Sequence, residues 1–152
     1  MSKLLIVDDD IRLRKLVRTY GEVEHYECDE AADGLAALEK LQNDHFDLVI
    51  LDVMMPGLDG FETLERIRKT SEIPVIMLTA RNEEYDKLTG FGLGVDDYVS
   101  KPFSPKELMA RVGAVLKRNG KKSTVLSYQY KELEIRPDSR TASISGKELI
   151  LA

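Results

Sequence analysis

The stretch Asp47-Leu48-Val49-Ile50-Leu51-Asp52 decides the fold, because four consecutive apolar residues are followed at once by a carboxylate. A strand that is apolar on both faces is typical of a parallel sheet covered by helices on both sides, whereas a sheet with one wet face would alternate. Three other apolar runs also end in polar residues: Leu4 to Val7 in Asp8-Asp9, Val75 to Leu78 in Thr79, and Tyr98 to Ser100 in Lys101. Because ligands bind beyond the carboxyl ends of parallel strands, these residues predict one shared site.

The rest of the chain alternates short apolar runs with segments of helical period, which is typical of βαβ units. One-sided apolar stripes such as Leu13, Leu16, Val17 and Tyr20 indicate helices that pack on the sheet. We therefore predict an α/β fold with a doubly wound, five-stranded parallel sheet. The expected strands cover about 3–7, 26–29, 47–51, 74–78 and 97–100, and the later helices cover 61–69, 82–91 and a segment opened by Pro105.

Composition limits the size and the environment of the protein. The chain has 152 residues, 43% of them hydrophobic, which suits one domain and a modest appendage. No apolar run approaches the roughly 20 residues that a bilayer span needs, and no basic-then-apolar leader opens the chain, so we expect a soluble, cytosolic protein without membrane contact. The net charge of −5 disfavours nonspecific attraction to nucleic acid. The single cysteine, Cys28, is expected to be a packed core thiol.

The character of the sequence changes after Arg118. Residues 1–118 form the expected α/β domain, and 119–123 combine turn formers with charge, which is typical of a linker. Residues 124–152 contain short apolar runs broken by turn signals, which predicts an antiparallel β segment. A sheet of about this length buries little by itself, so we expect it to be the start of a second domain.

The predicted site has a definite chemistry. Asp8, Asp9 and Asp52 would repel one another, and Mg²⁺ is the natural cation to relieve this repulsion because it prefers hard oxygen ligands. The sequence contains no Cys/His cluster of the kind that binds zinc, and His25 and His45 are expected on the surface. Asp10 is suited to cap the helix that follows.

Asp52 is the best candidate for a nucleophile toward phosphorus, because it stands alone at the end of the central strand. An unpaired carboxylate there has no obvious structural purpose. Thr79 and Lys101 would stabilise negative charge on a phosphoryl group without acid or base chemistry. Lys101 precedes Pro102, and the sequence leaves the isomer of that bond open.

The chain resembles the receiver domains of two-component response regulators. The resemblance runs from about Lys3 to Arg118 and rests on four motifs in order: Ile6-Val7-Asp8-Asp9-Asp10, Leu51 to Gly57, Leu78-Thr79-Ala80 and Lys101-Pro102-Phe103. It implies the flavodoxin-like strand order 2-1-3-4-5, which the doubly wound sheets of this superfamily share. It also implies that Asp52 is the phosphoacceptor, that Asp9 binds Mg²⁺ directly and Asp8 through water, and that the Met54 carbonyl is a further ligand. Thr79 and Tyr98 would form the switch, although Tyr98 could also be simple core packing.

Within receivers, the chain is most similar to the OmpR/PhoB subfamily, which dimerises through its fourth helix, fifth strand and fifth helix. The resemblance implies a homodimer with the ion pairs Lys87–Glu107, Asp97–Arg111 and Asp96–Arg118 around an apolar patch of Leu88, Phe91 and Ala110. The alternative is that these charges are solvated singly, since exposed ion pairs contribute little by themselves.

Residues 133–149 resemble the opening sheet of the winged-helix DNA-binding domain of this subfamily. The helices that would follow lie beyond Ala152, so promoter binding is expected for the intact protein only. We expect a phosphoacceptor that receives its phosphoryl group from a sensor histidine kinase and is not otherwise an enzyme. Two alternatives remain: a stand-alone receiver that acts by protein docking, and an aspartyl-phosphate phosphohydrolase, whose nucleophile would follow the first strand instead of the third.

Overall fold

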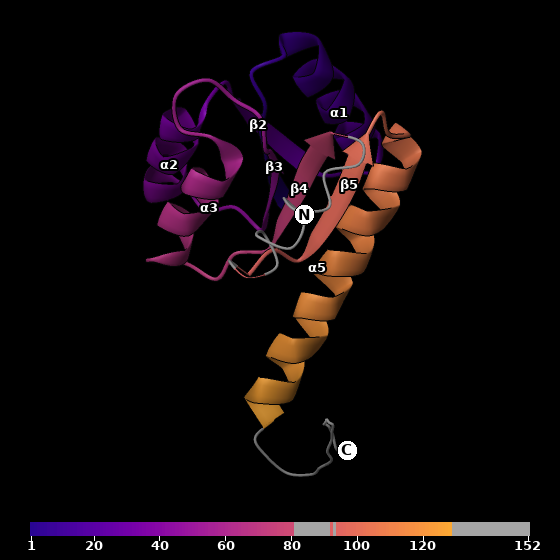
Figure 1. Ribbon diagram of the computed structural model, residues 1–152. Coiled ribbons are helices and arrows are strands. Elements are labelled where there is room, and N and C mark those ends of the chain that lie inside the picture. The colour runs from indigo at the N-terminus through magenta and orange to yellow at the C-terminus, as the bar shows by residue number, and fades with distance from the viewer. Residues whose placement is uncertain (81–91, 93, 129–152) are drawn as a thin grey trace. The chain divides into compact units, whose positions relative to one another are not determined.

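The computed structural model describes residues 1–80, 92 and 94–128, with side chains described through residue 119. Its centre is a sheet of five parallel strands in the order β2-β1-β3-β4-β5, and the arrangement can be followed in Figure 1. This confirms the predicted fold class and strand order. The strands are β1 (Lys3–Val7), β2 (Glu27–Ala31), β3 (Leu48–Asp52), β4 (Val75–Ala80) and β5 (Asp97–Lys101).

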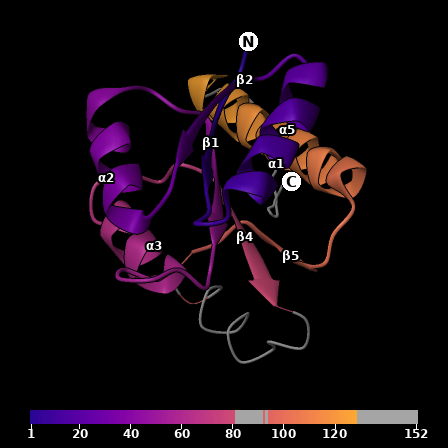
Figure 2. The ribbon, with the colours of Figure 1, turned by 90° about the horizontal axis from the view of Figure 1, so that it is seen from above.

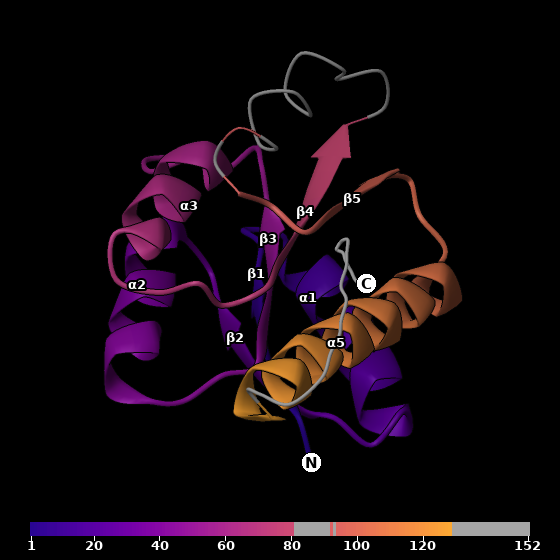
Figure 3. The ribbon, with the colours of Figure 1, turned by 90° about the horizontal axis from the view of Figure 1, so that it is seen from below.

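Helices cover both faces of this sheet, as the continuously apolar third strand predicts. Helices α2 and α3 lie on one side, and α1 and α5 lie on the other (Figure 2); the view from the opposite end shows the same two layers (Figure 3). The predicted helix at 82–91 lies outside the described residues. The helices are α1 (Ile11–Val23), α2 (Gly34–Asn43), α3 (Gly60–Arg68) and α5 (Pro105–Tyr128).

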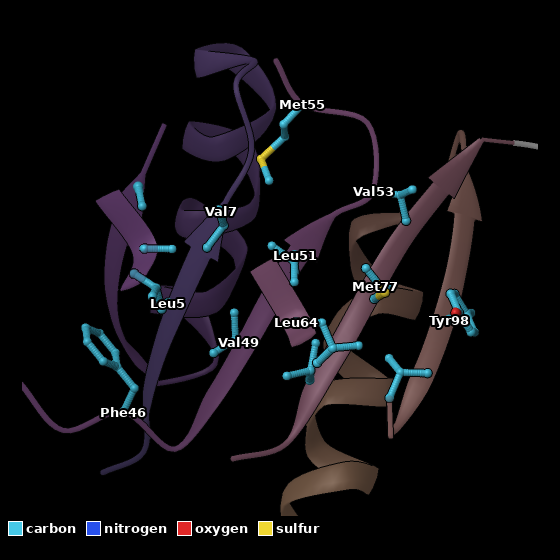
Figure 4. Packing of buried hydrophobic residues seen from close by; sticks show 14 residues of the cluster. Leu5, Val7, Phe46, Val49, Leu51, Val53, Met55, Leu64, Met77 and Tyr98 are labelled. Carbon is cyan, nitrogen blue, oxygen red and sulfur yellow. The ribbon is translucent and has the colours of Figure 1, made fainter. Parts of the chain in front are cut away.

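The core consists of two hydrophobic layers separated by the strands. Leu5, Val49 and Leu51 point toward α2 and α3, where they pack with Leu64, as Figure 4 shows in part. Leu4, Ile6, Leu48 and Ile50 pack on the opposite face with residues of α1 and α5 such as Val17 and Val112. Every residue of β3 is buried. The alternation of side chains along each strand thus divides one apolar run between two layers.

Each of the first three helices begins where a side chain satisfies its free backbone N–H groups. Asp10 caps α1 by accepting from Arg12 and Leu13, as predicted. Asp33 caps α2 in the same way. Asp59 and Glu62 form a reciprocal capping box at α3. These caps fix the entry of the three helices that follow β1, β2 and β3.

Cys28 behaves as a core thiol. It is 7% exposed, and burial raises its pKa to about 11, with nearby Glu22 acting in the same direction. Its sulfur lies where a Cβ on Gly21 would come within 2.8 Å, so a side chain at position 21 would collide with it. Gly21 is therefore a close-packing residue inside α1.

The end of α5 differs from the prediction. The sequence suggests a linker at 119–123, whereas α5 continues through Tyr128 and includes these residues. A single Gly120 costs a helix only about 1 kcal/mol, and the neighbouring lysines are good helix formers, so turn composition alone was a weak signal. The chain divides into two compact units, Met1–Leu116 and Lys117–Ala152. The predicted antiparallel segment falls at 124–152, of which 129–152 lie outside the described residues.

Within the described ranges, none of the helices combines the length and the apolar character needed to cross a bilayer.

Candidate functional site

Four strands deliver polar side chains to the carboxyl edge of the sheet. Asp8 follows β1 directly, Asp52 is the last residue of β3, and Lys101 is the last residue of β5. Thr79 lies one residue before the end of β4, so the strand runs two residues further than predicted. The parallel registers between neighbouring strands bring these positions to the same edge, as the sequence predicts.

Three carboxylates form the centre of the site. One oxygen from each of Asp8, Asp9 and Asp52 lies within 4.8 Å of the others. Asp8 and Asp52 are only 1% and 3% exposed, whereas Asp9 is exposed. The backbone N–H of Asp10 donates to Asp8 Oδ1 at 2.9 Å and orients that carboxylate. The site is therefore closed toward the core and open on the side of Asp9.

Asp52 is ionised with difficulty in this setting. Burial raises its pKa from 3.8 to about 6, and the charge of Asp8 adds to this increase. Lys101 and the backbone N–H of Met54 act in the opposite direction, because both stabilise the carboxylate, but they compensate only in part. A buried carboxylate beside another carboxylate is unstable by itself, which points to a cationic ligand.

Lys101 brings a positive charge to the carboxylates of the site. Its Nζ donates to Asp52 Oδ1 at 3.0 Å and to Asp8 Oδ2 at 3.4 Å. Burial opposes its charge, but the bonds and charges of these two aspartates prevail and raise the pKa of Lys101. The bond from Lys101 to Pro102, which the sequence left open, is cis.

Thr79 carries a hydroxyl that lacks a partner. The residue is 1% exposed, and within the part of the chain whose atoms are described its Oγ1 has no hydrogen-bond partner. Buried hydroxyls are rarely left in this condition, since each costs about 1–3 kcal/mol. The equally buried Thr63, away from the site, donates to the Asp59 carbonyl at 2.7 Å. Thr79 is thus prepared to donate to a group that binds at the site.

The donor set fits Mg²⁺. The carboxylates of Asp8, Asp9 and Asp52 offer oxygen atoms only, and hard oxygen ligands at few positions suit an ion that retains several waters. His25 and His45 are both exposed, as predicted, so neither belongs to this cluster. Met54 is 68% exposed, and the ligand role of its backbone carbonyl stays a prediction from the resemblance.

Gly60 supports the end of β3. Its N–H donates to the Val53 carbonyl at 2.8 Å, and a Cβ at this position would lie 2.4 Å from the carbonyl oxygen of Asp52. A side chain would therefore push α3 away from the strand that ends in Asp52. The glycine thus permits a close approach of two backbones.

Tyr98 is buried in the core layer that faces α2 and α3. It is 7% exposed and pairs in register with Met77 on β4 (Figure 4). It lies two strand positions before the Thr79–Ser100 register pair. This position suits both interpretations made from the sequence, core packing and a switch residue.

The residues predicted at the dimer interface are partly engaged inside the chain. Arg111 Nη1 pairs with Asp97 at 3.0 Å, and its Nη2 pairs with Glu107 at 3.3 Å. Asp96 Oδ2 accepts from the backbone N–H of Val75 at 2.8 Å. Ala110 is exposed and Arg118 is also at the surface, while Lys87, Leu88 and Phe91 lie outside the described residues. The predicted intermolecular pairing of Asp97 with Arg111 therefore has an intramolecular counterpart in the single chain.

Sequence reasoning missed two residues next to the site, Arg14 and Glu30. Arg14 on α1 donates to the carbonyl oxygen of Asp8 and to the side chain of Glu30 on β2. No spacing rule in one sequence links a helix residue to both a preceding loop and the next strand. Only the packing of α1 against β2 brings them together.

A doubly wound parallel sheet with a buried acidic cluster and a lysine at its carboxyl edge defines a class of α/β proteins that bind ligands at this edge. Comparison with known families makes the class specific. The response regulator receiver domain matches residues 4–113, and the chain belongs to this family of two-component signalling domains.

Similar proteins agree with this assignment. A transcriptional regulatory protein CpxR homolog from Haemophilus influenzae is 52% identical over 127 residues, which are 84% of this chain and 56% of that protein. The transcriptional regulatory protein ResD from Bacillus subtilis is 41% identical over 157 residues, which are 99% of this chain and 65% of that protein. The resemblance to OmpR/PhoB-type regulators is thereby confirmed. The chain spans less than two thirds of the length of these two relatives.

Solved receivers have the same fold. The chemotaxis protein CheY4 from Vibrio cholerae superposes with a TM-score of 0.72 at 37% identity, covering 76% of this chain and 98% of that one. The receiver domain of the Francisella response regulator 1452 gives a TM-score of 0.74, also at 37% identity, covering 78% and 99%.

Proposed function

We propose that this chain is the phosphoacceptor of a two-component system, in which Asp52 receives a phosphoryl group from a sensor histidine kinase. Asp8, Asp9, Asp52 and the Met54 carbonyl would hold Mg²⁺, which supplies positive charge to the phosphoryl oxygens and neutralises the clustered carboxylates. The proposal rests on membership of the receiver family and on the chemistry of the site.

One observation carries the proposal. Burial and the charge of Asp8 raise the pKa of Asp52, and the Lys101 ammonium lies 3.0 Å from its carboxylate. The adjoining strand carries Thr79, whose hydroxyl has no partner among the described atoms. Such an arrangement is costly for a structural carboxylate. It is suited to a carboxylate that becomes covalently modified, because a phosphoryl group offers acceptor oxygens to both Lys101 and Thr79.

The transfer itself needs few protein groups. An Asp52 carboxylate oxygen attacks phosphorus while the bond to the phosphohistidine nitrogen breaks, and that nitrogen retains the bonding electron pair. Lys101 remains protonated and turns from Asp52 toward a phosphoryl oxygen. Positioning and charge stabilisation therefore account for the role of this chain, without a general acid or base.

The same geometry provides a way to report modification. The hydroxyl of Thr79 gains a partner once a phosphoryl oxygen is present, and movement of β4 at this point alters the space beside Tyr98 on β5. We infer that this pair forms the switch. Its output would be a homodimer through the fourth helix, fifth strand and fifth helix, and promoter binding in an intact regulator.

Two other functions are compatible with parts of the site. A receiver that acts by docking alone would use the same fold without stable modification. An aspartyl-phosphate phosphohydrolase would place its nucleophile after β1, at Asp8 or Asp9. We favour the phosphoacceptor because Asp52 is the carboxylate that Lys101 approaches most closely, at 3.0 Å against 3.4 Å for Asp8. On this proposal the chain is not an enzyme toward other substrates.

The deciding experiment is intact mass spectrometry after incubation with acetyl phosphate. The chain, Asp52→Asn and the matched variant Asp47→Asn, at the opposite end of the same strand region, are compared with Mg²⁺ and with EDTA. We expect one Mg²⁺-dependent phosphoryl adduct in the chain and in Asp47→Asn, and none in Asp52→Asn.

Peptide mapping separates the alternatives. An adduct on Asp8 or Asp9 would favour the phosphohydrolase, and a folded chain without any adduct would favour the docking receiver. Light scattering before and after phosphorylation then tests the dimer. A molar mass that does not increase in the modified chain would contradict the proposed output but leave the phosphoacceptor chemistry intact.

A further inference from the structure

Arg14 links the acidic site to the neighbouring strand. It lies at the start of α1, and its Nη1 donates to the carbonyl oxygen of Asp8 at 2.6 Å. Its Nε donates to Glu30 Oε1 on β2 at 3.0 Å. The side chains of Arg14 and Glu30 are only 12% and 10% exposed. The guanidinium is thus held between two fixed acceptors, a geometry that its planar array of donors allows.

Glu30 is a strong anchor for this arginine. Lys15 and Arg18 both approach Glu30 Oε2 at 3.0 Å, so three cations surround one carboxylate. Burial opposes its charge, but the bonds from Lys15, Arg18 and Arg14 prevail and lower its pKa to about 2. Glu30 therefore remains anionic at neutral pH and keeps Arg14 in place.

The acceptor at the other end has particular importance. The Asp8 carbonyl belongs to the peptide unit that joins Asp8 to Asp9, and a peptide unit is planar. A bond that fixes this oxygen therefore fixes the direction in which the chain presents both carboxylates. The N–H of Asp8 is also held, since it donates to the Ala31 carbonyl at 3.2 Å. Arg14 and β2 together clamp the turn from β1 to α1.

We propose that Arg14 is a positioning residue that sets this turn so that Asp8 and Asp9 face Asp52. The inference rests on the proposed function, because it assigns Arg14 a role in Mg²⁺ binding at the same site. Arg14 acts through the backbone of Asp8 and touches neither the cation nor the phosphoryl group. Groups that orient metal ligands commonly change affinity by about tenfold or more when they are removed.

The test compares Arg14→Gln and Arg14→Lys with the unaltered chain and with Lys15→Gln. Lys15 is a matched control because it also binds Glu30 from α1 but, in the described contacts, does not reach Asp8. Calorimetric titration measures Mg²⁺ affinity without phosphodonor. A second assay measures the Mg²⁺ concentration that gives half-maximal adduct formation with acetyl phosphate.

We expect Arg14→Gln to weaken Mg²⁺ affinity about tenfold and to raise the half-maximal Mg²⁺ concentration equally. The rate at saturating Mg²⁺ should change little, because Asp52, Thr79 and Lys101 are intact. Arg14→Lys, which can keep one of the two bonds, should give an intermediate value. Lys15→Gln should bind Mg²⁺ like the unaltered chain.

Several outcomes would overturn the proposal. Unchanged affinity in a folded Arg14→Gln variant would do so, as would an equal loss in Lys15→Gln. If Arg14→Gln fails to fold in thermal unfolding, Arg14→Lys decides, and normal affinity in that variant rejects the role. If the chain binds Mg²⁺ but forms no adduct, the proposed function fails while the affinity comparison still tests Arg14. A chain that binds no Mg²⁺ overturns both.

Discussion

The two ends of the sheet use polar side chains in opposite ways. At the amino-terminal end, Asp47 accepts from the backbone N–H of Lys3 at 2.8 Å, and Asp96 accepts from that of Val75 at the same distance. At the carboxyl end, Asp52 has a raised pKa and Thr79 lacks a partner among the described atoms. At the amino-terminal end, polar side chains accept hydrogen bonds from the backbone of the strands. At the carboxyl end, one polar side chain has a raised pKa and another has no partner among the described atoms. The carboxyl edge of the sheet is therefore the place where the fold is less stable than it could be, and it is also the edge where ligands bind.

The largest change in stability is expected from removing Arg68, which lies at the amino-terminal end of the sheet. Its guanidinium donates to the carbonyl oxygens of Ile73 and Gly94, both at 2.8 Å. Arg68→Ala removes these bonds and should lower the free energy of unfolding by about 3 kcal/mol, measured by urea denaturation. Arg66→Ala, an exposed arginine on the same helix, is the control and should change stability little. Equal effects in both variants would remove the contrast between the two ends.

The next effect has the opposite sign and lies at Asp52. Without Mg²⁺, Asp52→Asn should raise the free energy of unfolding by about 2 kcal/mol at pH 8, because it removes a buried charge beside Asp8. Urea denaturation in EDTA measures this change. Asp47→Ala, at the other end, should instead lower stability by about 1 kcal/mol, since the Lys3 N–H loses its acceptor. A destabilised Asp52→Asn would show that the carboxylate is a structural group.

The free energy of unfolding should depend on pH because of Asp52. The pKa of Asp52 rises from 3.8 to about 6 on folding, so between these values the folded chain binds more protons than the unfolded chain. This carboxyl group therefore adds stability as pH falls through about 6, and the gain is complete near 4. The advantage of Asp52→Asn should shrink over that window in Mg²⁺-free titrations. A constant difference from pH 8 to pH 4 would contradict the raised pKa.

A smaller loss is expected at Asp96. Asp96→Ala leaves the N–H of Val75 without its acceptor and should lower the free energy of unfolding by about 1.5 kcal/mol. Glu65→Ala on the exposed face of α3 is the control. Thermal unfolding of both variants measures the difference. If Asp96→Ala is as stable as the control, the bond from the Val75 N–H contributes nothing measurable to stability.

The smallest effect compares two buried threonines. Thr79→Val replaces a hydroxyl that has no partner among the described atoms by a methyl group, and it should raise stability by about 1 kcal/mol. Thr63→Val removes the bond to the Asp59 carbonyl and should lower stability by a similar amount. Urea denaturation of the pair gives both signs in one experiment. The same sign in both variants would mean that Thr79 is satisfied in solution.

Much of this contrast was predictable, because it follows from strand ends. Asp52 and Lys101 were assigned to one site from their places after apolar runs, and parallel strands bring such places together. The isomer before Pro102 was beyond prediction, since the two forms of such a bond differ by only about 0.5–1 kcal/mol in a free chain. Arg14 was missed because its partners lie in a loop and in another strand.

The charge pattern left open which charged residues pair with one another. The resemblance assigns Asp97 and Arg111 to opposite subunits, and the single chain shows the two residues paired with each other. The intermolecular pairing stays a prediction. A sequence shows which charges exist but does not distinguish pairing within a chain from pairing between chains. The residues predicted as a linker, 119–123, lie within α5. Glycine and lysine are compatible both with a turn and with a solvated helix, so composition did not distinguish the two.

The distribution of the site over the strands also has a consequence for protein synthesis. A growing chain contains all three carboxylates once Asp52 has been made, but Lys101 follows 49 residues later. Until then the acids have neither their lysine nor the edge strand β5 that carries it. A growing chain that has not yet reached β5 therefore presents the three carboxylates without Lys101. On the proposed function, Asp52 would meet the full set of site residues only after β5 has joined the sheet.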